Sequence, residues 1–183
     1  TATVAALAGS SITFSATGVT GAPASITVSA GSGQTAIAGS LLAVPPAAIV
    51  KDANANPVAG AAVVFAVATG GGSVVGASQT TNANGIATLG GWTIGTTAGP
   101  NSVTGTMSGL TPIAFTATGN AGPAFAVAPI AGISQSEQVA GLVSVPPAVN
   151  VTERYGNGVS GVIVTFSVAA GGGTISDSVK TTN

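Results

Sequence analysis

Few side chains of this sequence could take part in catalysis. The 183 residues include four Asp or Glu and three Lys or Arg, and they include neither His nor Cys. Without His the Ser–His–Asp mechanism is excluded, and without Cys there is no thiol nucleophile, disulfide framework or Cys-based zinc finger. A Ser–Lys pair would have to use Lys51 or Lys180, and both occupy turn or strand-end contexts. We therefore expect no enzyme, no catalytic residue and no cofactor.

One polar turn contains residue types that can bind metals. Asp52, Asn54 and Asn56 alternate after a run of apolar residues. Calcium takes about six to eight oxygen ligands, usually with several carboxylates, and this turn has one. Asp and Asn also stabilise turns by hydrogen-bonding to nearby backbone. We interpret the segment as a structural turn, keep a calcium site as the alternative, and expect no metal.

Two further features could mark binding sites. The side chains of Trp92 and Tyr155 could stack on a sugar ring, although a single Trp in such a chain is more often buried in a core. The triple glycine that begins at Gly70 lacks the Gly-Lys-Ser/Thr ending of a phosphate loop, and no helix follows it. We interpret it as a flexible turn between strands.

Composition limits the partners. Charged residues make up 4% of the chain, the net charge is −1, and no basic cluster exists that could bind nucleic acid. Hydrophobic residues make up 45% and aromatic residues 4%, so a core must consist mainly of Val, Ile, Ala and Leu. No apolar run is long enough to span a membrane. The chain opens Thr-Ala-Thr-Val without Met, so we expect a processed or excised piece.

The strongest pattern is an internal repeat. Phe65 and Phe166 lie 101 residues apart, as do Gly60 and Gly161, and Gly70 and Gly171. The Val-Pro-Pro runs at positions 44 and 145 have the same spacing. A period near 100 residues, rich in Val, Ile and Thr between Gly and Asn turns, is typical of one β-sandwich domain. No stretch of ten residues indicates a helix, so we predict an all-β chain of tandem sandwiches.

Individual strands can be placed from alternation and turn residues. In the segment 61–67 we expect Val63, Phe65 and Val67 on one buried face. Prolines 45 and 46 should stand at a strand start or edge, because they cannot donate to a ladder. The other expected strands are 25–29, 87–94 with Trp92, 102–106, and two short strands within 3–18 that match 106–119.

These matches predict three parts: residues 1–20 as the C-terminal hairpin of a preceding or partner domain, 21–120 as a complete sandwich, and 121–183 as a sandwich without its last strands. Asn183 corresponds to Asn82 of the earlier copy. Two interpretations stay open. The chain is a window in a long covalent array, or separate subunits join head to tail and residues 1–18 of one complete 121–183 of another. The predicted contact residues are Val4, Leu7, Ile12 and Phe14, with Phe14 in the place of Phe115.

The segment from Asp52 to Gly60, followed by Val-Val-Phe-Ala-Val, resembles the bacterial immunoglobulin-like repeats of the invasin and intimin type, the group called Big_1. Segments 80–87 and 93–99 fit the same pattern, whereas the second copy departs from it at Glu153-Arg-Tyr-Gly156. The resemblance implies tandem immunoglobulin-like β-sandwiches of seven or more strands, used as an extracellular stalk in adhesins and repetitive surface proteins. The lectin-like receptor-binding tips of that family are not found in this sequence.

Two functions follow as expectations. The first is a structural subunit or segment of a repetitive bacterial surface fibre, filament or adhesin stalk, extracellular and in contact with copies of itself. The alternative is a carbohydrate- or receptor-binding adhesin module near Tyr155 or Trp92. Because the chain has four carboxylates and no His, we also expect a nearly flat stability profile from about pH 3 to about pH 9.

Overall fold

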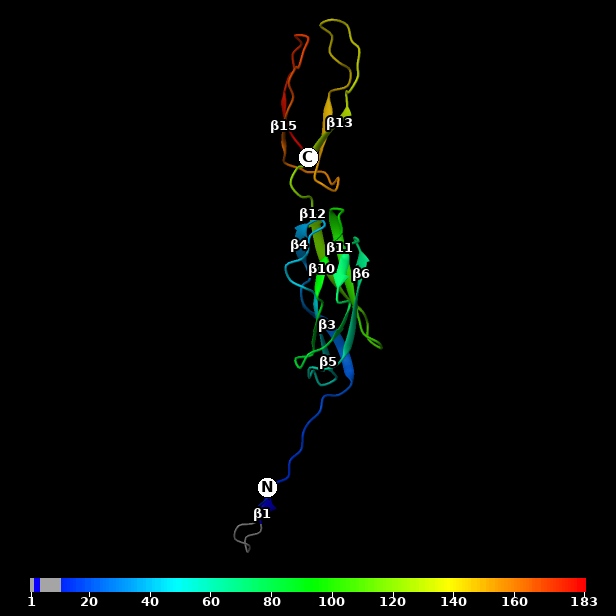
Figure 1. The fold of residues 1–183 in the computed structure, drawn as a ribbon, viewed down its shortest axis with the longest axis vertical. Helices are drawn as coiled ribbons and strands as arrows, with labels where there is room; N and C mark the ends of the chain where they lie inside the picture. The colour runs from blue at the N-terminus through cyan, green and yellow to red at the C-terminus, as the bar shows by residue number, and fades with distance from the viewer. Residues whose placement is uncertain (1, 4–10) are drawn as a thin grey trace.

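The computed structural model describes residues 2–3 and 11–183, and every regular element in them is a β-strand (Figure 1). The all-β prediction is therefore confirmed. The strands are β1 (Ala2–Thr3), β2 (Ser11–Ile12), β3 (Pro23–Ala30), β4 (Gln34–Ile37), β5 (Ala47–Asp52), β6 (Ala62–Thr69), β7 (Ser73–Val75), β8 (Ser78–Thr80), β9 (Ile86–Thr88), β10 (Gly91–Thr93), β11 (Gly99–Thr106), β12 (Ile113–Asn120), β13 (Ala126–Ala131), β14 (Ala148–Thr152), β15 (Ile163–Thr165) and β16 (Val179–Thr181). Within the described residues, no helix is long and apolar enough to cross a membrane.

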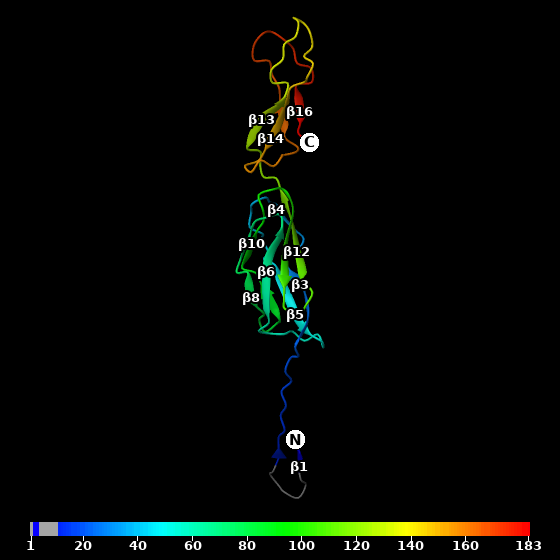
Figure 2. The same cartoon turned by 90° about the vertical axis from the view of Figure 1, so that its right-hand side faces the viewer.

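Strands β3 to β12 form an immunoglobulin-like sandwich, which we call the central sandwich (Figures 1 and 2). One main sheet has the order β3-β5-β9 and the other the order β4-β12-β11-β6-β8, and β10 and β7 form a separate two-stranded sheet. The first two strands of the central sandwich belong to different sheets. β3 pairs antiparallel with β5, and β4 pairs parallel with β12. Two packed sheets with this division of strands are the immunoglobulin architecture.

The core lies between the two sheets. On β6, Val63 and Phe65 are buried and Val67 is partly buried against the core, while Val64 is exposed, so the expected face is the one that faces the core. The rings of Phe65 and Phe115 lie 5.8 Å apart between centroids and are tilted by 47°. The largest fully buried apolar side chains are Trp92, Phe65, Phe115, Leu89, Ile94, Val50, Val63 and Val103.

One predicted strand is wrong. The segment 87–94 is two strands in different pairings, because β9 joins β5 and β10 joins β7. The break falls at Gly90, whose backbone N–H donates to the Val75 carbonyl at 3.0 Å. A Cβ at Gly90 would lie 2.8 Å from that carbonyl oxygen, so the chain changes sheets where only glycine fits.

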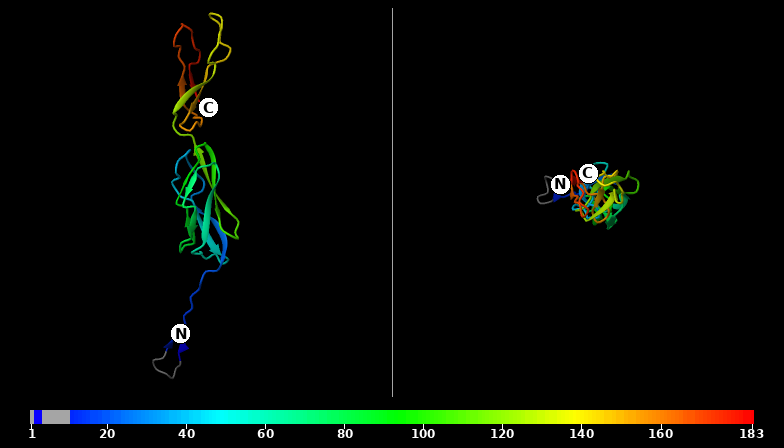
Figure 3. Two further views of the ribbon diagram at one scale, coloured as in Figure 1. Left: turned by 45° about the vertical axis from the view of Figure 1, so that its right-hand side comes forward. Right: turned by 90° about the horizontal axis from the view of Figure 1, so that it is seen from above.

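Residues 121–183, the C-terminal unit, form two hairpins, β13–β14 and β15–β16. Their registers repeat those of the central sandwich. Val127 pairs with Val151 as Ile26 pairs with Val50, and Ile163 pairs with Thr181 as Ala62 pairs with Thr80, in each case 101 residues earlier. The C-terminal unit lies at one end of the central sandwich, and the residues that precede β3, which we call the N-terminal segment, lie at the other (Figure 3).

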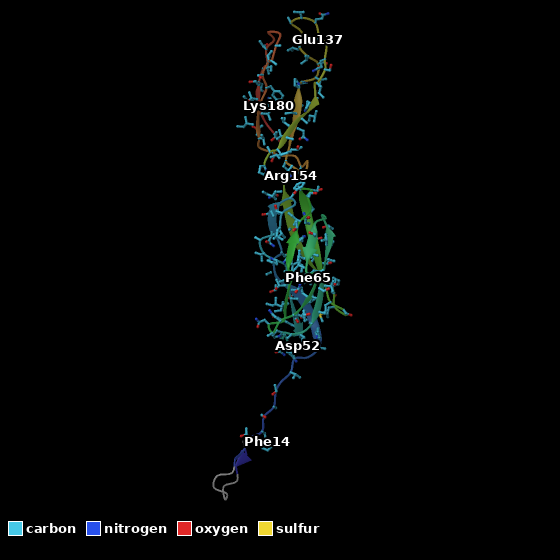
Figure 4. All side chains as sticks on the ribbon, in the orientation of Figure 1. Phe14, Asp52, Phe65, Glu137, Arg154 and Lys180 are labelled. Carbon is cyan, nitrogen blue, oxygen red and sulfur yellow. The ribbon has the colours of Figure 1, made fainter. Side chains whose placement is uncertain are left out.

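The N-terminal segment carries a short pair of strands. Ala2 pairs with Ile12, which matches the pairing of Gly105 with Ile113 between β11 and β12. Residues 13–20 form no strand, and the side chain of Phe14 is 74% exposed, far from Phe65 in the core (Figure 4). The predicted contact residues Val4 and Leu7 lie outside the described residues, and so does the side chain of Ile12.

Candidate assembly site

A turn built around a carboxylate stands at the N-terminal end of the central sandwich. Asp52 ends β5, and we call residues 52–56 the Asp52 turn. Its Oδ1 accepts hydrogen bonds from the backbone N–H groups of Asn54 and Asn56, each at 2.9 Å. Its Oδ2 accepts from the backbone N–H of Gly21 at 2.9 Å and from Asn56 Nδ2 at 3.1 Å. Asp52 thus fixes both its own turn and the chain that enters β3.

These hydrogen bonds determine the charge state of the carboxyl group. The bond from the Gly21 N–H, followed by that from the Asn56 side chain, lowers the pKa of Asp52 to about 2. The carboxylate has about four lone-pair directions, and its four N–H donors use them. These bonds support the interpretation of the segment as a structural turn. Among the residues that the structure describes, no group of three or more Asp, Glu, His or Cys could hold a metal.

The same construction recurs at residues 153–157, the Glu153 turn. Glu153 Oε1 accepts from the backbone N–H of Tyr155 at 2.7 Å and of Asn157 at 3.1 Å, and from Asn157 Nδ2 at 2.7 Å. Burial raises the pKa of Glu153, but the hydrogen bonds from Asn157 and Tyr155 outweigh that effect, and the pKa lies below its usual value. Glu153 is therefore an ionised turn anchor like Asp52, one methylene longer.

The Glu153 turn is also a joint, because it contacts the distal tip of the central sandwich. We define that tip as Gly39 together with residues 96–98, which the bond from Gly39 N–H to the Gly95 carbonyl holds side by side at 2.8 Å. Asn157 Nδ2 donates to the Thr96 carbonyl at 2.7 Å, and the Ala98 N–H donates to Asn157 Oδ1 at 2.8 Å. One amide side chain, oriented by Glu153, thus joins the two parts of the chain.

Tyr155 completes this joint by packing on Gly39. A Cβ at Gly39 would lie 2.9 Å from Tyr155 Cε2 and 3.0 Å from its hydroxyl oxygen, so the ring occupies the place of a side chain. Gly39 also has a φ of 77°, in the left-handed region. A crevice of about 360 Å³ borders the contact, lined by residues that include Ile37, Phe125 and Arg154.

A second crevice, of about 420 Å³, opens on the C-terminal unit between its two hairpins. We call it the open groove, and its apolar lining residues are Leu142, Val143, Pro146, Pro147, Phe166 and Ile175. Phe166 and Val143 correspond to Phe65 and Leu42, which are buried core residues in the central sandwich. In that sandwich β11 and β12 complete the core with Val103 and Phe115. The open groove is therefore the equivalent core left uncovered.

The sequence-predicted site residues meet different outcomes. Trp92 is fully buried, so the interpretation of Trp92 as a sugar-binding surface is wrong. Its Nε1 has no hydrogen-bond partner among the described residues. Tyr155 is 50% exposed and lies at the joint. Phe14 does not contact the open groove of its own chain, since it lies at the opposite end of the molecule (Figure 4).

Sequence reasoning missed two residues of the joint. The role of Asn157 had a signal in the sequence, because Asn56 stands 101 residues earlier in an equivalent turn. The role of Gly39 had none, because nothing local indicates which end of the sandwich faces the next unit.

Lys180 forms an exposed ion pair with Asp177.

Comparison with known proteins gives structural similarity alone. No protein-family model matches the chain, and no curated protein matches it. InvD of Yersinia pseudotuberculosis is 18% identical, with 76% of this chain and 43% of that chain covered and a TM-score of 0.44. The Escherichia coli adhesin FdeC is 18% identical over 84% of this chain and 50% of that one, with a TM-score of 0.47. The D0-D1 domain of intimin is 20% identical over 88% and 79%, with a TM-score of 0.41.

This chain thus spans half or less of the InvD and FdeC structures. At such low identities and TM-scores, these similarities carry no information about function.

Proposed function

We propose that this chain is a structural segment of a repetitive fibre, filament or adhesin stalk on the outside of a bacterial cell, without enzymatic activity, and that it contacts copies of itself. The observation that carries the proposal is the open groove. An apolar core surface is uncovered on residues 121–183, and residues 11–18 of the same chain resemble the strand that covers the equivalent surface in the central sandwich.

A tandem arrangement is supported by hydrogen bonds that recur 101 residues apart. Thr81 Oγ1 accepts from the Ala61 N–H at 2.8 Å and donates to the Val58 carbonyl at 2.7 Å. Thr182 Oγ1 makes the same pair of bonds, with the Val162 N–H at 2.9 Å and the Val159 carbonyl at 2.6 Å. On this proposal, 21–120 is one complete immunoglobulin-like unit, 121–183 is the first part of another, and residues 1–20 are the last hairpin of a third.

Strand complementation is the mechanism we propose for the contact. Residues 11–18 of one copy take the place of β12 on the C-terminal unit of another, with Phe14 in the position of Phe115 against Phe166. Burying an exposed Phe side chain stabilises a contact by about 1.5–3 kcal/mol, and the added strand also pairs backbone groups. Continuation of a covalent array would cover the groove with the same kind of strand.

Deletion of residues 1–18 separates these two routes. The purified chain and the deletion variant are examined by sedimentation and negative-stain electron microscopy. Complementation predicts that the chain assembles and that the variant does not, while Trp92 emission stays that of a buried indole in a folded central sandwich. Filaments formed by the deletion variant would rule out complementation by this segment.

A second candidate function, a carbohydrate- or receptor-binding module, rests on Tyr155. Its ring is half-exposed beside a crevice of about 360 Å³. A glycan array probed with the chain and with Tyr155→Ala tests this candidate. Saturable binding that is lost in the variant would favour a binding module over a purely structural role.

A further inference from the structure

The joint inside this chain depends on a residue that its repeat does not preserve. At the distal tip of the central sandwich stands Gly39, and the equivalent position of the C-terminal unit, 101 residues on, is Ala140. Both residues have a positive φ, of 77° for Gly39 and 68° for Ala140. The turn is the same as well, since Ser40 N–H donates to Ile37 O and Gly141 N–H donates to Gln138 O. At position 39/140 the two tips differ by the Cβ of Ala140. Gln138 and Val139 also stand where Ile37 and Ala38 do, and no residues of 121–183 correspond to residues 96–98.

The residue that packs on the tip also differs between the two turns, and the difference in its size complements the difference between Gly39 and Ala140. Tyr155 of the Glu153 turn lies where a Cβ on Gly39 would be, within 2.9 Å of it. The equivalent residue of the Asp52 turn is Asn54, a much smaller side chain. Asn54 is exposed, and it supports its turn through its backbone N–H, which donates to Asp52 at 2.9 Å.

From these two differences we infer that the tip carrying Ala140 receives the Asp52 turn of a second copy of this chain, and that the Ala140–Asn54 pair selects it. The inference rests on the proposed function. If residues 11–18 of a second copy occupy the place of β12, the short link after them brings that copy's Asp52 turn to the tip, as residues 121–124 bring the Glu153 turn to Gly39. Glu137, three residues before Ala140, lies at the end of the molecule opposite to Asp52 (Figure 4).

The contact between Ala140 of one copy and Asn54 of the next sets the order of the units. Gly39 can accept either a Tyr or an Asn above it, whereas the Cβ of Ala140 collides with a Tyr ring and leaves room for Asn. A turn of the Tyr155 kind is thus rejected at the joint between copies and accepted at the joint within a copy. Steric rejection of a wrong partner is a common source of specificity between similar interfaces.

A rescue experiment on the full chain tests the pair. Assembly of the wild type, Asn54→Tyr, Ala140→Gly and the double variant is followed by sedimentation over a range of concentrations. Asn54→Tyr should raise the concentration needed for assembly by about tenfold or more, because an overpacked contact loses at least that much affinity. The double variant should assemble at about the wild-type concentration, and Ala140→Gly alone should assemble at least as well as wild type.

The matched control is at the internal joint. Gly39→Ala should loosen the contact between the central sandwich and the C-terminal unit, and added Tyr155→Asn should restore it, as measured by small-angle X-ray scattering. Trp92 emission reports whether the central sandwich of each variant is folded.

The possible outcomes distinguish the proposed function from the inference about the Ala140–Asn54 pair. Wild-type chains that never associate would overturn the proposed function together with this inference. Wild-type assembly that Asn54→Tyr leaves unchanged, or that Ala140→Gly fails to restore, would overturn the inference and leave the proposed function standing. If Asn54→Tyr disturbs folding, the internal cycle decides, and Gly39→Ala without any effect on the joint overturns the inference.

Discussion

At the scale of single residues, the carboxylates of the Asp52 turn and the Glu153 turn each accept several hydrogen bonds, so their loss should destabilise the protein. Asp52 accepts four hydrogen bonds from N–H donors and fixes the entry of β3 through Gly21. Asp52→Ala leaves these donors without an acceptor and should lower the melting temperature, measured by Trp92 fluorescence. Asp52→Asn should have a smaller effect, and Asp177→Ala, which removes an exposed ion pair, should have almost none. An Asp52→Ala variant that melts like wild type would contradict this role.

The same two residues revise the flat pH profile that the sequence predicts. The pKa of Asp52 is lowered to about 2 and that of Glu153 is also lowered. A carboxyl group with a lowered pKa in the folded state contributes stability that is complete above its unfolded pKa of about 4 and is lost as pH falls toward its folded pKa.

We therefore expect stability to be constant from neutral pH to about pH 5 and to decrease toward pH 2. Urea unfolding at several pH values measures this. Asp52→Asn should flatten the acid limb, and an unchanged acid limb in that variant would contradict the assignment.

Glu153 lies 101 residues after Asp52, which is the repeat spacing, and the structure places both at the same kind of turn. The repeat spacing could not predict that Asn157 reaches Thr96 and Ala98, because residues about 60 apart in sequence meet there only through the order in which the units stack. Trp92 lies on β10, which pairs with β7, and its ring is buried in the core.

Among the elements, the turn between β6 and β7 contains three consecutive glycines with positive φ, at 81°, 76° and 86°. A Cβ on Gly72 would lie 2.2 Å from the Thr93 carbonyl oxygen, whereas a Cβ on Gly71 would meet nothing within 4 Å. Gly71→Ala should cost about 1–2 kcal/mol from the left-handed backbone. Gly72→Ala should cost at least about 1 kcal/mol more, because a backbone collision adds to the same strain. Equal unfolding free energies for the two variants would show that the close approach of β10 does not matter.

Several elements could be predicted from local pattern. The alternation in 61–67 predicted the buried face of β6, and Pro45 and Pro46 stand just before β5 begins at Ala47. The parallel strand β4 was not predicted, since its four residues gain their order from pairing with β12, about 80 residues away. The single strand expected at 87–94 failed at Gly90, where packing against Val75 outweighs a continuous apolar run.

For the whole molecule, Phe65 and Phe166 form a matched pair of test positions in equivalent strands. Phe65 is 1% exposed, and Phe65→Ala should lower the unfolding free energy by about 3–5 kcal/mol. Phe166 is half-buried at the open groove, so Phe166→Ala should change the stability of the single chain much less and should prevent assembly. Denaturant unfolding and sedimentation measure the two effects. Normal assembly of Phe166→Ala would argue against the groove as the contact.

The parallel pairing of β4 with β12 has a mechanical consequence. The chain enters the central sandwich through β3 at one end and leaves it through β12 at the other (Figure 2). Tension applied to the two ends of the chain would therefore pull β4 and β12 in opposite directions along their length. The ladder from Gln34–Ala117 to Ile37–Asn120 is then loaded in shear, so its hydrogen bonds must break together and not one after another. A stalk made of such units should resist pulling far better than its sparse aromatic core indicates, and single-molecule stretching of the chain would measure this.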